Sequence, residues 1–217
     1  MINAVIFDMD GVLFDTERLS EGIWISVGKQ FGIELTSEHM GLLRGGDYES
    51  GERILKKLFG ENFDFLTMYE KAHVLWDETI AEHVPVKQGT IELLQYLSDA
   101  GYPAAIASSS PKHRVMNNLA LTDTARYFSA VICGDMVENS KPHPEIFLKA
   151  AAALGMPPSQ CMAIEDSYNG VRSAAAAGCY TVMVPDLDLP TAETKLLCKK
   201  TAQSLNDIKG ILASLND

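Results

Sequence analysis

Short apolar runs alternate with helix-like segments through most of this chain. Five four-residue runs are apolar throughout or nearly so: Ala4–Phe7, Ala104–Ala107, Ala130–Cys133, Cys161–Ile164 and Thr181–Val184. Such runs are typical of strands that are buried on both faces of a parallel sheet. Helical periodicity predicts intervening helices at Thr90–Ala100, Lys112–Leu121, Pro144–Leu154 and Tyr168–Ala177. The alternation predicts an α/β fold with a doubly wound parallel sheet.

The stretch from Thr16 to Val84 departs from this alternation. It contains only helix-like segments, with no strand-like run: Glu17–Phe31, Ser37–Leu43, Ser50–Phe59 and Phe65–Glu82. The simplest interpretation is an all-helical cap inserted after the first strand. We therefore expect an α/β core domain of residues 1–15 and 85–217 and a helical cap domain of residues 16–84. Beyond Pro185 the chain is polar, and only one short amphipathic segment, Leu205–Leu215, is expected there.

Composition narrows the class of protein. The 217 residues are 47% hydrophobic and 22% charged, as in an ordinary globular protein that needs no disulfide or structural metal. A formal charge of −11 argues against a nucleic-acid-binding surface, which requires clustered Lys and Arg. The four cysteines lack zinc-ligand spacing and read as buried, reduced thiols. No signal peptide or membrane span is apparent, so we expect a soluble, cytoplasmic monomer with no membrane or obligate protein partner.

Polar residues follow the predicted strands. Ligands bind at the carboxyl ends of the strands in an open parallel sheet, so these residues should meet at one edge. Asp8 and Asp10 follow the first run, and Ser108, Ser109 and Ser110 follow the second. Lys141 follows the third run, and Glu165 and Asp166 follow the fourth. Ser110, which precedes Pro111, reads as a helix N-cap.

Clustered carboxylates at one edge require a compensating cation. Oxygen ligands at this density suit Mg²⁺, which proteins commonly share between carboxylates and a phosphoryl group. Ser108 and Ser109 would supply hydroxyl and backbone N–H donors to phosphate oxygens, and Lys141 would add positive charge. The set of residues therefore indicates phosphoryl transfer, in which catalysis is mostly positioning and charge neutralisation.

Four motifs in this order resemble the haloacid dehalogenase superfamily: D-x-D-G after the first strand, Ser after the second, K-P before a helix, and E-D after the fourth. The resemblance spans essentially the whole chain, because the helical insertion lies where this superfamily has its α-helical cap. Three segments of the chain resemble the sugar-phosphate phosphatase and β-phosphoglucomutase branch of this superfamily: F-D-M-D-G-V-L-F-D-T-E, S-K-P-H-P-E-I-F and I-E-D-S-Y-N-G-V.

The resemblance implies a role for each site residue. Asp8 would be the nucleophile that forms an aspartyl-phosphate, and Asp10 the general acid and base. Ser108, Ser109 and Lys141 would bind phosphate. The metal ligands would be Asp8, Asp10 through its backbone carbonyl, Asp166, and Glu165 directly or through water. The second aspartate favours phosphoryl transfer over dehalogenation.

The cap leaves alternatives open. Mutases of this branch have the pattern D-T-x-x-x-H in the first hinge, and an Arg in the cap that holds the second phosphate of the substrate. This chain has Ser20 at the place of the His and Tyr48 near the place of the Arg. Arg44, Gly45 and Tyr48 remain candidate substrate contacts. We expect a Mg²⁺-dependent phosphatase of small phosphorylated metabolites, most simply a hexose phosphate. The alternatives are a hexose-phosphate mutase and, in another class, a catalytically idle acidic interaction module.

Overall fold

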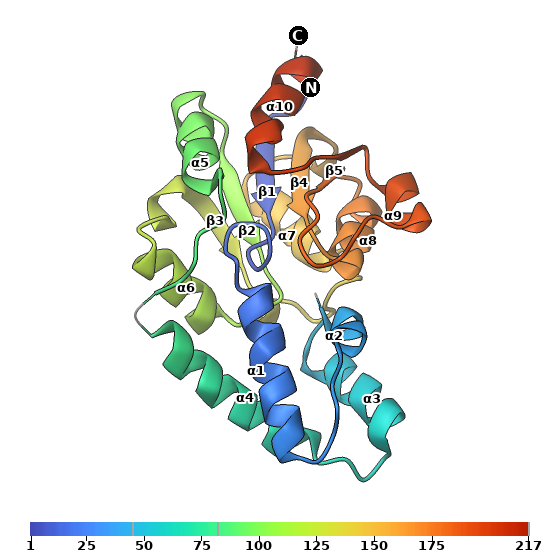
Figure 1. Ribbon diagram of the computed structural model, residues 1–217. Coiled ribbons are helices and arrows are strands. Elements are labelled where there is room, and N and C mark those ends of the chain that lie inside the picture. Colours follow the sequence, from blue (N-terminus) through green and yellow to red (C-terminus); the bar gives the residue numbers. More distant parts are fainter. Residues whose placement is uncertain (45, 82, 217) are drawn as a thin grey trace.

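A six-stranded parallel sheet lies at the centre of the protein. The computed structural model describes residues 1–44, 46–81 and 83–216. The strand order is β3-β2-β1-β4-β5-β6, and every neighbouring pair is parallel (Figure 1). The strands are β1 (Ala4–Phe7), β2 (Ala104–Ala107), β3 (Phe128–Ile132), β4 (Cys161–Glu165), β5 (Tyr180–Met183) and β6 (Lys200–Thr201). The predicted doubly wound α/β fold is confirmed.

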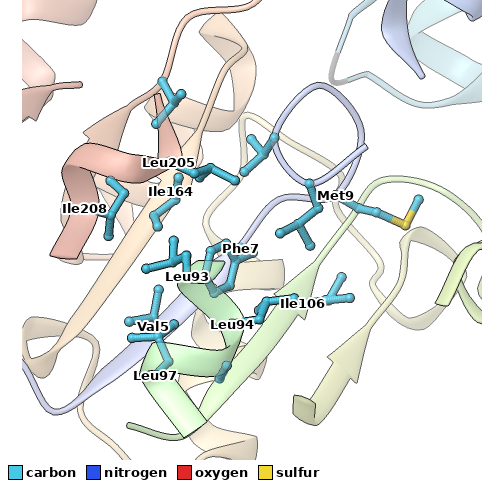
Figure 2. Close-up of a cluster of buried hydrophobic side chains, with 14 of the residues drawn as sticks. Val5, Phe7, Met9, Leu93, Leu94, Leu97, Ile106, Ile164, Leu205 and Ile208 are labelled. Carbon is cyan, nitrogen blue, oxygen red and sulfur yellow. The ribbon is translucent and has the colours of Figure 1, made fainter. Parts of the chain in front are cut away.

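The central strand β1 is apolar throughout because both faces of the sheet are covered. Val5 and Phe7 belong to one hydrophobic cluster, and Ala4 and Ile6 to another on the opposite face. The first cluster includes residues of α5 (Thr90–Asp99), α6 (Lys112–Leu121) and α10 (Ile208–Asn216), and the second includes residues of α7 (Glu145–Ala153) and α8 (Tyr168–Ala176). Figure 2 shows Phe7 beside Leu93 and Leu94 of α5.

The predictions for the C-terminal part and for strand β3 were incomplete. Its polar sequence showed neither the short helix α9 (Ala192–Leu197) nor the sixth strand β6. Both residues of β6 are exposed, and this two-residue edge strand therefore carries no apolar run. Strand β3, predicted at Ala130–Cys133, begins two residues earlier and is only partly buried. Edge strands lack the apolar signal that marks the centre of the sheet.

Four helices fill the insertion after β1: α1 (Glu17–Gln30), α2 (Ser37–Leu43), α3 (Tyr48–Phe59) and α4 (Phe65–Ile80). They surround a hydrophobic cluster of their own, which includes Val27, Leu55 and Met68. Figure 1 shows them together at the end of the molecule away from both chain ends. Among the described residues, no helix has the length and apolar character that a membrane crossing needs.

The chain leaves the sheet region for these helices and returns to it through adjacent positions. Phe14 and Val86 form an antiparallel bridge. The Asp15 N–H donates to the carbonyl of Pro85 at 2.8 Å, and the Lys87 N–H donates to that of Leu13 at 2.9 Å. The two connections therefore form a short ribbon, which we call the hinge ribbon (residues 13–15 and 85–87).

Candidate active site

The polar residues that follow the strands meet at one edge of the sheet. Asp8 directly follows β1, Ser108 directly follows β2, and Glu165 ends β4. Carboxylate oxygens of Asp8, Glu165 and Asp166 lie within 4.8 Å of one another, and all three residues are buried. Residues up to 158 positions apart in the chain, such as Asp8 and Asp166, are therefore brought into one group by the parallel sheet.

Lys141 joins two of these carboxylates. Its Nζ lies 2.5 Å from Asp8 Oδ1 and 2.6 Å from Glu165 Oε1, and its side chain is only 1% exposed. Burial lowers the pKa of Lys141, but the charges of Asp8 and Glu165 outweigh it and hold the pKa above its usual value. Lys141 therefore stays positively charged and holds one oxygen of Asp8 in place.

Glu165 is fully occupied by partners. Besides the bond from Lys141, its Oε2 accepts hydrogen bonds from the Asp166 N–H at 3.1 Å, the Ser167 N–H at 3.2 Å and the Ser167 hydroxyl at 3.1 Å. Gly170 allows this approach, because a Cβ there would lie 1.9 Å from the Glu165 carboxyl group. Glu165 is thus arranged to position Lys141 and the loop that carries Asp166.

The donor set around Asp166 fits a hard cation. Among the described residues, no hydrogen-bond donor or cationic group pairs with the Asp166 carboxylate, although this residue is only 3% exposed. Burial raises the pKa of Asp166 well above its usual value, and the charges of Glu165 and Asp8 raise it further. Burial also raises the pKa of Asp8 to about 8, with Lys141 opposing the shift. Buried, mutually repelling carboxylates of this kind are stabilised by a divalent cation.

Asp10 is held by two hydroxyls. The Thr16 hydroxyl donates to Asp10 Oδ1 at 2.6 Å, and the Ser110 hydroxyl donates to Oδ2 at 2.8 Å. The prediction that Ser110 caps the following helix was wrong, because α6 begins after Pro111 and has no side-chain cap. The Ser110 N–H instead donates to Ser108 Oγ at 3.1 Å, which tightens the turn and turns the Ser110 side chain towards Asp10.

Glu17, at the start of α1, is a further acidic neighbour that the sequence did not single out. Burial raises its pKa to about 8, and the charges of Asp10 and Asp8 add to the shift. An acidic residue is common in the first turn of a helix, where it interacts favourably with the helix dipole, so its presence in the sequence does not by itself indicate a site. Gly11 leaves room for this group: at its φ of +79° a Cβ would lie 2.1 Å from Asp166 Oδ2 and 3.2 Å from Glu17 Cγ.

A cavity of about 400 Å³ opens between the sheet edge and helices α1 to α4. Asp8, Asp10, Ser109 and Ser110 line one part of it. Ser108 and Lys141 are buried, at 0% and 3% exposure. The volume lies near the lower end of the range for small-molecule sites, about 300–1,000 Å³. The cavity therefore suits a single metabolite.

Two of the three predicted cap contacts, Arg44 and Tyr48, line this cavity, and Gly45 lies outside the described residues. Arg44 is already paired. Its Nη2 lies 2.6 Å from Asp188 Oδ1, and its Nη1 lies 3.0 Å from Glu21 Oε2. The side chains of Arg44 and Asp188 are 8% and 5% exposed. Arg44 therefore connects α1 and the segment after α2 to the loop that follows β5.

We expect Arg44→Met to lower the free energy of unfolding by about 3–5 kcal/mol, because it leaves the Asp188 carboxylate buried without its cation. Urea unfolding at pH 7 measures the change. Adding Asp188→Leu should restore part of the loss. The control is Arg172→Met, which breaks the exposed pair with Glu193 and should change stability little. Equal losses in the two arginine variants would contradict the expectation.

Comparison with known proteins places this geometry in context. The family model of the haloacid dehalogenase-like hydrolases matches residues 2–178. A phosphorylated carbohydrates phosphatase of Thermotoga maritima is 30% identical over 177 residues, which cover 82% of each chain. A probable pseudouridine-5′-phosphatase of Drosophila melanogaster is 33% identical over 221 residues, covering 96% of this chain and 92% of the relative.

Solved structures agree with the sequence relatives. The β-phosphoglucomutase of Clostridium difficile superposes with a TM-score of 0.86 at 26% identity, covering 100% of this chain and 98% of the mutase. Coverage of this extent includes helices α1 to α4 as well as the sheet.

Proposed function

The chain belongs to the haloacid dehalogenase-like hydrolases, and from that premise we propose that it is a Mg²⁺-dependent phosphatase of small phosphorylated metabolites, sugar phosphates above all. One observation carries the proposal: Lys141 holds one oxygen of the buried Asp8 carboxylate at the edge of a cavity, beside Asp166, whose carboxylate has no partner in the described part of the chain. Asp8, Asp166 and the backbone carbonyl of Asp10 would hold the metal, with Glu165 oriented behind them.

In the proposed reaction, an Asp8 oxygen attacks phosphorus, and the bond between phosphorus and the ester oxygen breaks. Asp10 gives its proton to the departing alcohol oxygen, leaving an aspartyl-phosphate on Asp8. Asp10 then takes a proton from water, whose oxygen attacks phosphorus and releases inorganic phosphate and the Asp8 carboxylate. Bound Mg²⁺ supplies charge neutralisation for the phosphoryl oxygens. Thr16 and Ser110 keep the Asp10 carboxyl oriented throughout.

We propose that helices α1 to α4 act as a cap domain of residues 16–84 on a core of residues 1–15 and 85–217. Their separate hydrophobic cluster and the hinge ribbon support this division. Closure of the cap would exclude water while the aspartyl-phosphate forms.

A hexose-phosphate mutase is the second candidate, because a β-phosphoglucomutase shares the architecture. Ser20 and Tyr48 both line the cavity. In the mutase pattern, His stands where this chain has Ser20, and the cap Arg lies near the place of Tyr48. Of the described lining residues, the two cations, Arg44 and Arg114, are engaged with protein groups. The cavity therefore offers little to a second phosphate, and we favour hydrolysis.

The test is phosphate release from a panel of phosphorylated metabolites, measured with Mg²⁺ and again with excess EDTA. We expect release with Mg²⁺ only. β-Glucose 1-phosphate with catalytic bisphosphate separates the candidates, because a mutase yields glucose 6-phosphate and a phosphatase yields free phosphate. Absence of both turnover and Mg²⁺ binding would instead favour the idle interaction module.

Mg²⁺ should stabilise the fold, and more strongly at higher pH. At about a hundred times its Kd we expect it to raise Tm by roughly 5–10 °C. The raised pKa values of Asp8 and Asp166 mean that protons compete with the metal, so the rise should be larger at pH 8 than at pH 6. Thermal unfolding with and without Mg²⁺ measures it. Asp166→Asn should abolish the response, and an equal rise at both pH values would speak against these ligands.

Thr16→Val should lower kcat by roughly 10–100-fold with little change in KM, because Asp10 loses the hydroxyl that orients it. Valine has nearly the same shape, so the buried position stays filled. Thr16→Ser keeps the hydroxyl and serves as the control, with activity near that of the wild type. A valine variant as active as the serine variant would show that this hydrogen bond has no catalytic effect.

A further inference from the structure

One face of helix α1 lines the cavity with three side chains: Glu17, Ser20 and Trp24. Residues at this spacing lie above one another on the same side of a helix. Glu17 is the first residue of α1, at the end that follows β1, and the other two come on the next turns. Starting from the sheet edge, α1 therefore presents a carboxylate, a hydroxyl and an indole ring to the cavity.

Glu17 differs from the other carboxylates that line the cavity, because those accept hydrogen bonds from protein groups. The donors are Lys141 to Asp8, the Thr16 and Ser110 hydroxyls to Asp10, the Ser50 N–H to Asp47, and the Lys112 N–H to Asp135. Within residues 1–44, 46–81 and 83–216, no hydrogen bond or ion pair reaches the Glu17 carboxylate. An ionised carboxylate only accepts hydrogen bonds, so its partner must be a donor that enters the cavity.

Glu17 lies beside the reacting groups but outside the proposed metal ligands. Burial raises its pKa, the charges of Asp10 and Asp8 add to the rise in that order, and the charge of Arg44 opposes it. Glu17 is therefore a close neighbour of Asp10 on the side towards Arg44. The three described carboxylates whose oxygens lie within 4.8 Å of one another do not include it. This position suits a contact with the organic part of a substrate better than a contact with the metal.

Asp10 determines which part of the substrate comes next to Glu17. In the proposed reaction Asp10 gives its proton to the ester oxygen, so it must lie within hydrogen-bond reach of that oxygen. The carbon that bears the ester oxygen follows, and then the neighbouring carbon. Because Glu17 is adjacent to Asp10, a donor on that neighbouring carbon is the one that it reaches most directly. Ser20, one turn further along α1, comes next to the following part of the carbon chain.

We propose that Glu17 is a specificity-determining residue, which accepts a hydrogen bond from a hydroxyl group on the carbon next to the ester carbon of the substrate. The proposal rests on the phosphatase function and specifies one feature of the substrate, a phosphate monoester with a hydroxyl on the adjacent carbon. Such a hydroxyl forms a charge-assisted hydrogen bond with Glu17. A substrate without it leaves the carboxylate buried without a donor, which weakens binding of the transition state.

The decisive pair of substrates is glycerol 3-phosphate and 3-hydroxypropyl phosphate, which differ only in the hydroxyl next to the ester carbon. We expect kcat/KM to be roughly ten- to a hundredfold higher for glycerol 3-phosphate. Glu17→Met, which keeps the length of the side chain without an acceptor, should move this ratio towards one. Glu17→Gln keeps a neutral acceptor and should give an intermediate ratio. Glu38→Met is the matched control, because Glu38 is also acidic in a first helical turn but is exposed and belongs to α2.

The outcomes separate the two proposals. A ratio near one in the wild type, or one that Glu17→Met leaves intact, would overturn the role of Glu17 while the phosphatase function stands. Hydrolysis of p-nitrophenyl phosphate without turnover of either alcohol phosphate would have the same meaning. No Mg²⁺-dependent release from any of the three would overturn both proposals.

Mg²⁺ binding gives a readout without turnover. Calorimetry should give Glu17→Met a Kd for Mg²⁺ close to that of the wild type, because Glu17 lies outside the group of metal ligands. A Kd weakened by roughly tenfold or more, the range for groups that support a metal site, would make Glu17 part of that site and overturn the proposed contact with substrate.

Discussion

Asp8→Asn should reduce Mg²⁺-dependent phosphate release by at least about 10⁴-fold, because an amide has the shape of the carboxylate but does not attack phosphorus. Steady-state hydrolysis of p-nitrophenyl phosphate measures the loss. Asp10→Asn keeps the nucleophile and removes the proton donor, so its loss should be smaller, roughly 10²–10⁴-fold. An Asp8→Asn enzyme with activity near that of the wild type would refute the assignment of the nucleophile.

The same variant should remain folded. Because the folded-state pKa of Asp8 is raised to about 8, its ionised form costs stability, and this cost grows as the pH rises from the usual carboxyl range towards 8. A neutral asparagine removes that cost. Thermal unfolding in EDTA at pH 7 should therefore give a Tm equal to or above that of the wild type, which separates lost chemistry from lost structure.

Lys141→Met should have the second-largest effect, on activity and on stability together. Without the ammonium group, the buried carboxylates of Asp8 and Glu165 face each other uncompensated. We expect the free energy of unfolding to fall by about 3–5 kcal/mol at pH 7. Urea unfolding measures this change, and phosphate release should fall with it because Asp8 is no longer held.

The loss in Lys141→Met should depend on pH. Protonation of Asp8 relieves the repulsion, so the deficit in unfolding free energy should be larger at pH 8 than at pH 5. Lys149→Met, which removes an exposed lysine paired with Glu145 on the same helix, serves as the matched control and should lose far less at either pH. A deficit independent of pH would indicate lost packing of the side chain as its cause.

The strands of the sheet could be predicted from the sequence where all of their residues are buried. Strands β1 and β2 coincide with their predicted apolar runs, because every residue in them is buried. Burial at the edge is partial, and so β3 was displaced and β6 was missed. Among the helices, α2 and α6 match their predicted ranges, and the ends of several others lie one or two residues from the predicted position.

The site was predictable as far as it depends on strand ends. Asp8, Lys141, Glu165 and Asp166 meet because parallel strands end at the same edge. The contacts of Thr16 and Ser110 with Asp10, and the position of Glu17, depend on how turns orient side chains after the strands. Periodicity contains no such information.

The hinge ribbon has a consequence for how such a protein can change over evolution. Because the chain leaves at Asp15 and returns at Pro85 through hydrogen-bonded neighbours, the intervening segment is a closed loop whose two covalent connections to the sheet lie side by side. Replacing the part of that segment beyond Glu17 leaves the strand order in place, and with it Thr16, which holds the Asp10 carboxylate at the sheet edge. If the proposed division into cap and core holds, new specificities can arise by divergence of the cap while the carboxylates at the sheet edge are retained.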